Sequence, residues 1–363
     1  MSKLHQLYII VAPWILLALI VGLLTGLLQI GWDIPVQNIS GTHGLLMVGG
    51  FIGTVITLEK TLPVYERRWY IVFPVISGLS VLFIIIGIYK AALYFQLLAG
   101  LGLVVTYFWW LKQTREPYYR IMMMGALCWI IASAGLLAGR PLPLVLHWWM
   151  AFIIFTIVGE RLELTKFLPV KNLNMSLLYL FLFLFLAGIF MPYADYGKIV
   201  LGSSLIFISL WLLIFDIIKT SIKKAGQYRY IAILLLVGYV WLFLSGVLII
   251  TGSVLPNQYD MIVHSFFLGY TFSMIFAHGP IILPGFTKKN LNIFSPSLYV
   301  WVVLFHLSLI LRMGADMAQH AEIRKAAGLA NAVIILIFFA NIIFNTRKAL
   351  TQQTNLYVEN KRS

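Results

Sequence analysis

The chain has 363 residues, of which 61% are hydrophobic and 10% charged, and its formal net charge is +14 at pH 7. Soluble domains are about 45–50% apolar and about 25% charged, so this composition excludes an ordinary soluble domain. The positive charge does not indicate nucleic acid binding, because the basic residues are distributed between apolar runs instead of forming a basic domain.

Apolar runs that can cross a bilayer, roughly 20 residues each, follow one another along the chain. The second and sixth are short, so flanking residues must extend them. The chain is therefore predicted to be an all-α polytopic membrane protein, with residues 1–363 as one transmembrane domain and 345–363 as a short cytoplasmic tail. The twelve predicted spans are 7–30, 43–58, 69–89, 91–111, 119–139, 144–160, 174–191, 197–218, 229–251, 261–283, 295–312 and 325–345.

The first run is predicted to be a retained span. Its apolar core is too long for a cleavable signal peptide, and no A-x-A-like site follows it. The single cysteine, Cys128, lies inside the fifth span. It excludes an internal disulfide and any CxxC motif, and it is interpreted as a small buried apolar residue.

The basic residues predict the orientation. Placing the N-terminus in the cytoplasm puts twenty of the 26 Lys and Arg residues on the cytoplasmic side, as the positive-inside rule requires. Both termini are then cytoplasmic, and the expected location is the cell inner membrane, with the lipid bilayer as the main partner. The six basic residues assigned to the outer side are Lys90, Arg140, Lys198, Arg312, Arg324 and Lys325.

Three histidines begin outside-to-inside spans. His43, His147 and His264 stand at or near the first residues of spans two, six and ten. Four spans separate each from the next, which predicts three parallel repeats of four helices, at 7–115, 119–224 and 229–348. A phenylalanine follows each histidine by eight residues, at Phe51, Phe155 and Phe272.

Neutral imidazole is the commonest protein ligand for haem iron and copper, so the three histidines are candidates for a shared haem or metal site. The alternative is that they are interfacial hydrogen-bonding groups kept by repeat ancestry. Glycines at 49, 50 and 53, after His43, leave a shallow helix surface. Either a neighbouring helix or a flat cofactor can lie against it.

Two further histidines lie inside spans. His306 falls in the middle of span eleven and is a fourth cofactor-binding candidate, because a mid-membrane histidine is unusual. His278 stands before Gly279-Pro280 and is expected to be structural, at a kinked helix end.

Carboxylates gather at the cytoplasmic ends of spans two and six, at Glu59, Glu160 and Glu163. Lys166 or Arg67 is expected to pair with them in a solvated or salt-bridged interfacial cluster, and a proton-entry role is the alternative. No P-loop, dinucleotide fingerprint or zinc-protease motif occurs, so the sequence leaves open whether the protein is an enzyme.

Twelve spans, cytoplasmic termini and histidines near the outer ends of helices resemble the catalytic subunit of haem–copper oxidases and nitric oxide reductases. The chain is more similar still to the NnrS family, twelve-span haem- and copper-containing proteins linked to nitric oxide tolerance. The residues that carry the resemblance are Thr42-His43-Gly44-Leu45-Leu46-Met47 with Gly49 to Gly53, and His264 through His278-Gly279.

The resemblance implies that His43 and His264 are axial ligands of a b-type haem and that His147 takes the position of a copper ligand. It also implies a diatomic gas as ligand and a role in nitric oxide or redox stress response. Span seven lacks the family's tandem histidines, and span ten has only His264 at its outer end. A complete dinuclear centre is therefore not expected. The alternatives are a transporter of a small solute or metal ion, or a helper in cofactor assembly.

Overall fold

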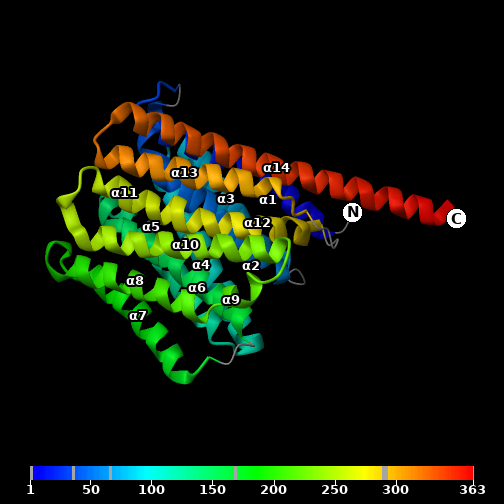
Figure 1. Cartoon of the computed structure of the whole chain (residues 1–363), viewed down its shortest axis with the longest axis horizontal. Coiled ribbons are helices and arrows are strands. Elements are labelled where there is room, and N and C mark those ends of the chain that lie inside the picture. The colour runs from blue at the N-terminus through cyan, green and yellow to red at the C-terminus, as the bar shows by residue number, and fades with distance from the viewer. Residues whose placement is uncertain (1–2, 35–36, 65–67, 167–169, 288–292, 363) are drawn as a thin grey trace. The chain divides into compact units, whose positions relative to one another are not determined.

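The computed structural model describes residues 3–34, 37–64, 68–166, 170–287 and 293–362. The chain divides into two compact units, Met1–Pro169 and Val170–Ser363. Within the described ranges every regular element is a helix (Figure 1). The predicted all-α polytopic fold is therefore confirmed, whereas the three repeat boundaries stay a prediction.

The first unit contains six α-helices and four short segments of 3₁₀ or π-helix in the ranges described. They are α1 (Lys3–Gln29), η1 (Gln37–Thr42), η2 (Leu45–Ile52), α2 (Gly53–Thr61), η3 (Leu62–Val64), η4 (Arg68–Ile71), α3 (Val72–Ile85), α4 (Tyr89–Thr114), α5 (Tyr118–Leu137) and α6 (Leu142–Thr165).

The second unit is built in the same way. Its described elements are α7 (Asn172–Phe190), η5 (Tyr193–Gly197), α8 (Lys198–Phe215), α9 (Ile218–Ser221), α10 (Gln227–Thr251), η6 (Gly252–Val254), α11 (Gln258–His264), η7 (Ser265–Thr271), α12 (Phe272–Thr287), α13 (Ser297–Met317) and α14 (Ala321–Arg362).

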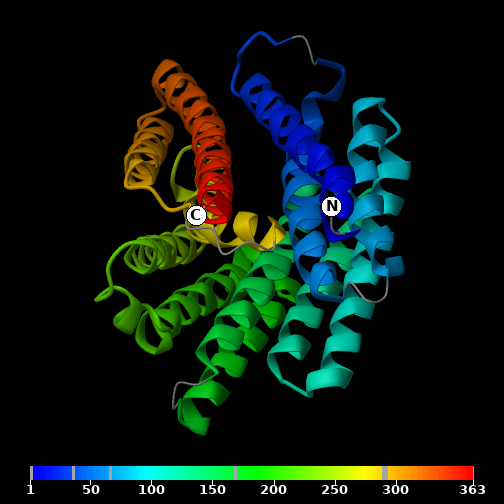
Figure 2. The ribbon, with the colours of Figure 1, turned by 90° about the vertical axis from the view of Figure 1, so that its right-hand side faces the viewer.

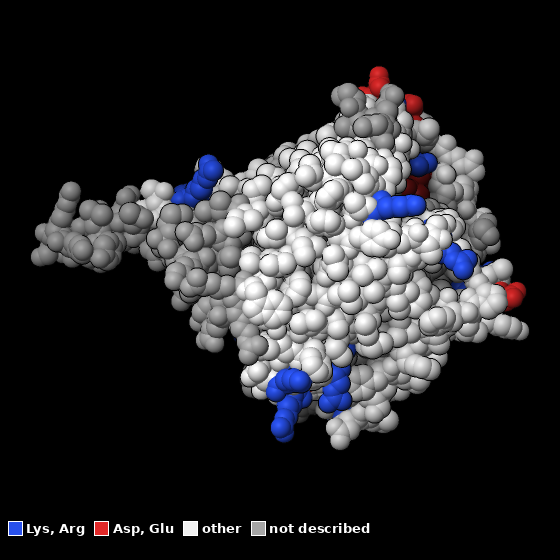
Figure 3. Space-filling view, turned by 180° about the vertical axis from the view of Figure 1, so that it is seen from behind, with Lys and Arg blue, Asp and Glu red and all other residues white. Residues whose placement is uncertain are grey.

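Eleven described helices are long and apolar enough to cross a membrane. A shorter apolar helix, Trp69–Ile85, occupies the place of the predicted span 69–89. Lys, Arg, Asp and Glu form only small patches on the face in Figure 3, and most of the described surface there is uncharged. Such a surface suits contact with lipid tails, which cannot solvate charged groups. The protein is thus a multi-pass membrane protein.

Spans two, six and ten, which His43, His147 and His264 begin or occupy, are the most buried ones. In their most apolar stretches 83% of residues are buried in Leu45–Val64, 72% in Leu142–Thr165 and 78% in Gln258–Pro280, and no other described span exceeds 50%. The histidines of spans two, six and ten therefore belong to interior helices, where a bound group would be shielded from lipid.

Packing within each unit follows chain order. In the first unit α3 packs against α4, α4 against α5 and α5 against α6. In the second, α7 packs against α8, α8 against α10 and α13 against α14, and Figures 1 and 2 both show α13 and α14 side by side. Small residues allow α8 and α10 to approach each other closely. A Cβ on Gly246 of α10 would lie 2.6 Å from the carbonyl oxygen of Gly202 of α8.

Helix α12 does not end at Gly279-Pro280, as the sequence suggested, but continues to Thr287. Pro280 has no N–H, so the carbonyl of Phe276 lacks its usual helical donor. The buried hydroxyl of Tyr230, on α10, donates to that carbonyl oxygen at 3.3 Å. The hydrogen bond satisfies a buried carbonyl that would otherwise face an apolar interior.

Replacing Tyr230 with Phe is expected to lower the free energy of unfolding by about 1–3 kcal/mol, because it leaves the Phe276 carbonyl without a donor. Thermal unfolding in detergent measures the effect. Tyr228→Phe, at a side chain that is 60% exposed, is the matched control and should change little. Pro280→Ala restores an N–H at this position, so the double variant should recover stability. Equal stability of Tyr230→Phe and the double variant would contradict the assignment.

Candidate functional site

His43 lies at the start of span two, with its imidazole against α1. Its Nδ1 donates to the carbonyl oxygen of Gly22 at 2.7 Å. A carbonyl can only accept, so Nδ1 carries a proton, and in the neutral ring the lone pair is on Nε2. A Cβ on Gly26 would lie 2.7 Å from Cε1 of His43, so the missing side chain of Gly26 makes the space that the ring occupies.

His264 is the last residue of α11 and has a more elaborate set of partners. Its Nδ1 lies 2.8 Å from the carbonyl oxygen of Asp260 and 3.2 Å from Oδ1 of the same residue. Both are acceptors, so this ring too carries its proton on Nδ1. The imidazole is largely buried, with 13% of the side chain exposed.

Arg312, on α13, holds the Asp260 carboxylate in a forked pair. Its Nη2 lies 3.1 and 3.0 Å from the two carboxylate oxygens, and its Nε lies 3.3 Å from Oδ2. Such a bidentate pair fixes the carboxylate in one orientation. Helices α11 and α13 therefore position His264 jointly, through residues 52 positions apart in the sequence.

A π-helical segment begins directly after His264, and another begins after His43 with only Gly44 between them. Segment η2 closes with a hydrogen bond from Gly53 N–H to the carbonyl of Val48, and η7 with one from Phe272 N–H to Phe267, each spanning five residues. Such segments are rare and are frequent at functional sites. In the described part of α6, which carries His147, the helix is regular from Leu142 to Thr165.

His147 stands near the beginning of α6 and is partly buried. Trp149, two residues later, packs over Gly44, where a Cβ would lie 3.1 Å from its Cζ3. The N-terminal part of α6 thus contacts the start of span two within the first unit. No three His, Cys, Asp or Glu side chains in the described ranges gather closely enough to hold a metal ion. The shared site of His43, His147 and His264 stays a prediction.

His306 is held by contacts with side chains of two neighbouring helices. The indole N–H of Trp241, on α10, donates to its Nδ1 at 3.1 Å, and its Nε2 lies 3.5 Å from Oγ of Ser273 on α12. Accepting at Nδ1 places the proton on Nε2, which is the opposite tautomer to that of His43 and His264. In this arrangement His306 connects three elements, and its role as a ligand stays a prediction.

Sequence reasoning missed the ionic groups around His264. Beyond Asp260 and Arg312, Asp316 lies on α13 with Oδ1 3.2 Å from Nε of Arg324 on α14. The available signal was an Asp four residues before His264, just ahead of the predicted span 261–283, together with basic residues close to the ends of spans eleven and twelve. Their pairing depends on how α11, α13 and α14 pack, which no local pattern encodes.

The carboxylates at the other end of spans two and six also have a partner that the sequence did not suggest. Lys60 Nζ lies 2.8 Å from Glu160 and 3.1 Å from Glu59, and its side chain is only 12% exposed. Arg67, one of the two expected partners, lies outside the described residues. Tyr119 donates to Glu163 at 3.5 Å. The cluster is therefore salt-bridged, one of the two forms expected, with Lys60 as the partner.

Comparison with known proteins gives one match. A family model described as Domain of unknown function (DUF8744) matches residues 8–347, nearly the whole chain. No curated protein sequence and no solved structure matches the chain.

Replacing Gly26 with Ala is expected to displace the His43 ring and break its hydrogen bond to Gly22. The cost in unfolding free energy should be about 1–3 kcal/mol, as for other overpacked sites. Gly41→Ala, where a Cβ would meet nothing within 4 Å, is the matched control. Thermal unfolding in detergent compares the two. The cost of Gly26→Ala should largely disappear in a His43→Ala background; an undiminished cost there would show that the ring is not the obstacle.

Proposed function

The chain belongs to the DUF8744 family, and we propose that it is an integral inner-membrane protein that binds haem through histidines on its interior spans. His264 in the second unit and His43 in the first are the proposed ligands. Haem iron held by imidazole supplies one-electron exchange and binding of a diatomic gas. The further proposal of a role in nitric oxide or redox stress response rests on the resemblance to the NnrS family.

The observation that carries the proposal is the arrangement of His264. Metal-ligating histidines almost always donate their second ring N–H to a carboxylate or backbone carbonyl, which fixes the tautomer and raises the basicity of the ligand nitrogen. His264 makes both contacts, to the Asp260 carbonyl and carboxylate, and Arg312 orients that carboxylate. The residues present therefore fit an imidazole ligand to iron or copper.

His43 supports the proposal in the same way. It donates from Nδ1 to a backbone carbonyl, begins an interior span and precedes a π-helical segment, as His264 does. Copper is the alternative metal at this position. Met47 packs on α1 one turn from His43, since a Cβ on Gly22 would lie 2.6 Å from its Sδ, and a thioether is a soft ligand that suits copper.

Transport of a small solute or ion is the second candidate function. The network of Lys60, Glu59 and Glu160 favours it, because ionisable groups in membrane spans mark ion and substrate pathways. Uptake into vesicles by a colourless, metal-free preparation would support this candidate over haem binding.

The first prediction for haem concerns the ligands. Protein purified in mild detergent from haem-replete cells should show a Soret band, sharp α and β bands after dithionite reduction, and iron near stoichiometry. His264→Ala and His43→Ala should each lose most of the iron, because each removes a ligand nitrogen. His320→Ala, at an exposed histidine, is the control and should keep it. Full iron retention in both ligand variants would contradict the assignment, and copper without iron would favour the alternative metal.

The second prediction concerns Asp260. Asp260→Asn keeps the shape of the side chain but removes the carboxylate that accepts from His264. Haem affinity should fall about 10–100-fold, the usual cost of changing a residue that orients a metal ligand. Transfer of haem to apomyoglobin measures the loss. Asp195→Asn, on the exposed segment η5, is the matched control. Unchanged transfer rates for Asp260→Asn would show that the contact does not support a ligand.

A further inference from the structure

A pocket of about 340 Å³ opens at the turn between α13 and α14 in the second unit. Its walls come from the end of α13, the first turn of α14 and the residues just before α11. The polar residues that line it are Asn257, Gln319, His320 and Arg324. None of them is a proposed haem ligand, so the pocket is a separate feature of the molecule.

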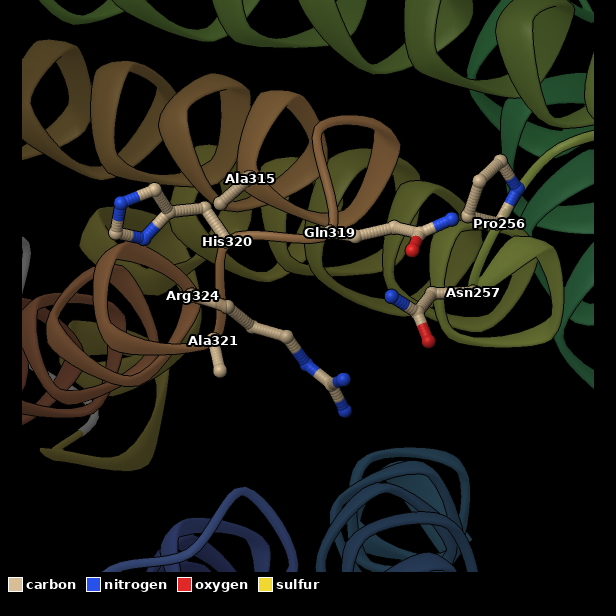
Figure 4. A pocket seen from close by; sticks show the side chains of 7 residues that line it. All are labelled: Pro256, Asn257, Ala315, Gln319, His320, Ala321 and Arg324. Carbon is tan, nitrogen blue, oxygen red and sulfur yellow. The ribbon is translucent and has the colours of Figure 1, made fainter.

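Three polar side chains converge on this space in Figure 4. Arg324 extends from α14 with its guanidinium toward Asn257, and the carboxamide of Gln319 approaches from the turn. The ring of His320 points the other way. One cation and two carboxamides, all able to donate hydrogen bonds, therefore face one another across the pocket.

The backbone holds two of these residues in an unusual conformation. Gln319 has φ +55° and Asn257 has φ +50°, in the left-handed region that favours glycine. Gln319 N–H donates to Asp316, and His320 N–H donates to Ala315, which is the helix-ending arrangement that normally carries glycine at the position of Gln319. The helix-ending turn favours glycine over glutamine at this position. The glutamine is explained instead by its side chain, which lines the pocket.

Asn257 helps to fix the wall of the pocket. Its Nδ2 donates to the carbonyl oxygen of Asp316 at 3.3 Å, which ties the residues before α11 to the end of α13. The pocket is thus held by hydrogen bonds between segments 59 positions apart in the sequence.

Charge identifies the class of ligand. Nε of Arg324 faces the buried Asp316 carboxylate and lies 3.2 Å from its Oδ1. Its terminal amino groups form a planar fork that matches carboxylate and phosphate oxygens. The pocket also adjoins the N-terminus of α14, whose dipole favours negative charge. Its volume is at the small end of the range for ligand pockets.

We propose that this pocket binds a small oxyanion, a carboxylate or phosphate group, through Arg324, Gln319 and Asn257. The site does not depend on haem, and its test uses no haem readout. The anion can reach the pocket as a soluble solute or as a lipid head group, and the two sources share this chemistry.

Isothermal titration of the full chain in neutral detergent, with inorganic phosphate and separately with acetate, tests the proposal. At least one anion should bind saturably. Arg324→Gln should weaken binding about tenfold or more, because a charge-assisted hydrogen bond is lost. Lys325→Gln is the matched control, since it removes the same charge from the neighbouring residue, which does not line the pocket. It should change affinity less than about twofold, as expected for a screened surface charge.

Gln319→Gly separates binding from folding. Glycine suits a φ of +55°, so thermal stability should stay the same or rise while anion affinity falls about threefold or more. Arg324→Lys keeps the charge next to Asp316 and loses the fork, and it should also bind more weakly. Absence of saturable binding, an equal loss in Lys325→Gln and Arg324→Gln, or unchanged affinity in Gln319→Gly would each overturn the proposal.

The source of the anion is resolved by repeating the phosphate titration in vesicles. Phosphatidylcholine vesicles should preserve binding. If phosphatidylglycerol vesicles abolish it, the occupant is a lipid head group, and if they leave it unchanged, the occupant is a soluble anion. Both results support an oxyanion site, whereas absence of saturable phosphate binding in detergent and in both kinds of vesicle would overturn it.

Discussion

A buried polar group in a membrane span is stabilised by a partner within the protein, because lipid tails offer none. Threonines in the spans turn their hydroxyls onto carbonyls of their own helix, as Thr106 does to Gly102 and Thr156 to Phe152. Tyr230 serves the carbonyl that Pro280 leaves without a donor. The same constraint fixes His43, His264 and His306, each through at least one specific hydrogen bond.

This constraint links the fold to the proposed function. A histidine that donates to a carbonyl or carboxylate from Nδ1 is held with its lone pair on Nε2, and both proposed ligands share that tautomer. His306 has the other tautomer, because an indole N–H can only donate. Interior placement of spans two, six and ten adds shielding from lipid. The distinction among the histidines therefore comes from their neighbours, since their positions in the spans alone do not separate them.

Hydropathy predicted almost all of the fold. Span positions follow from runs of apolar residues, and the described helices agree with them with three exceptions: Trp69–Ile85 is shorter than expected, α12 continues past Pro280, and α14 continues to Arg362 beyond the predicted span. Less of the candidate site could be predicted from the sequence. His43, His147 and His264 were visible from their equivalent places, but Asp260 with Arg312, and Lys60 with Glu160, are pairs between separate helices. Their pairing depends on helix rotation, which hydropathy does not contain. The π-helical segments also leave no mark in an apolar run.

The π-helical segments have a consequence for how the chain tolerates change in length. In an ordinary span, deleting one residue rotates all that follows by about 100° and turns buried faces toward lipid. A turn closed over five residues holds one residue more than the α-helical turn it replaces. Within Leu45–Ile52 and Ser265–Thr271, losing one residue can therefore return the helix to regular α geometry while the flanking turns keep their orientation. The spans next to His43 and His264 thus each contain one extra residue close to the histidine. An insertion or deletion there can shift the position of the histidine without rotating the rest of the helix.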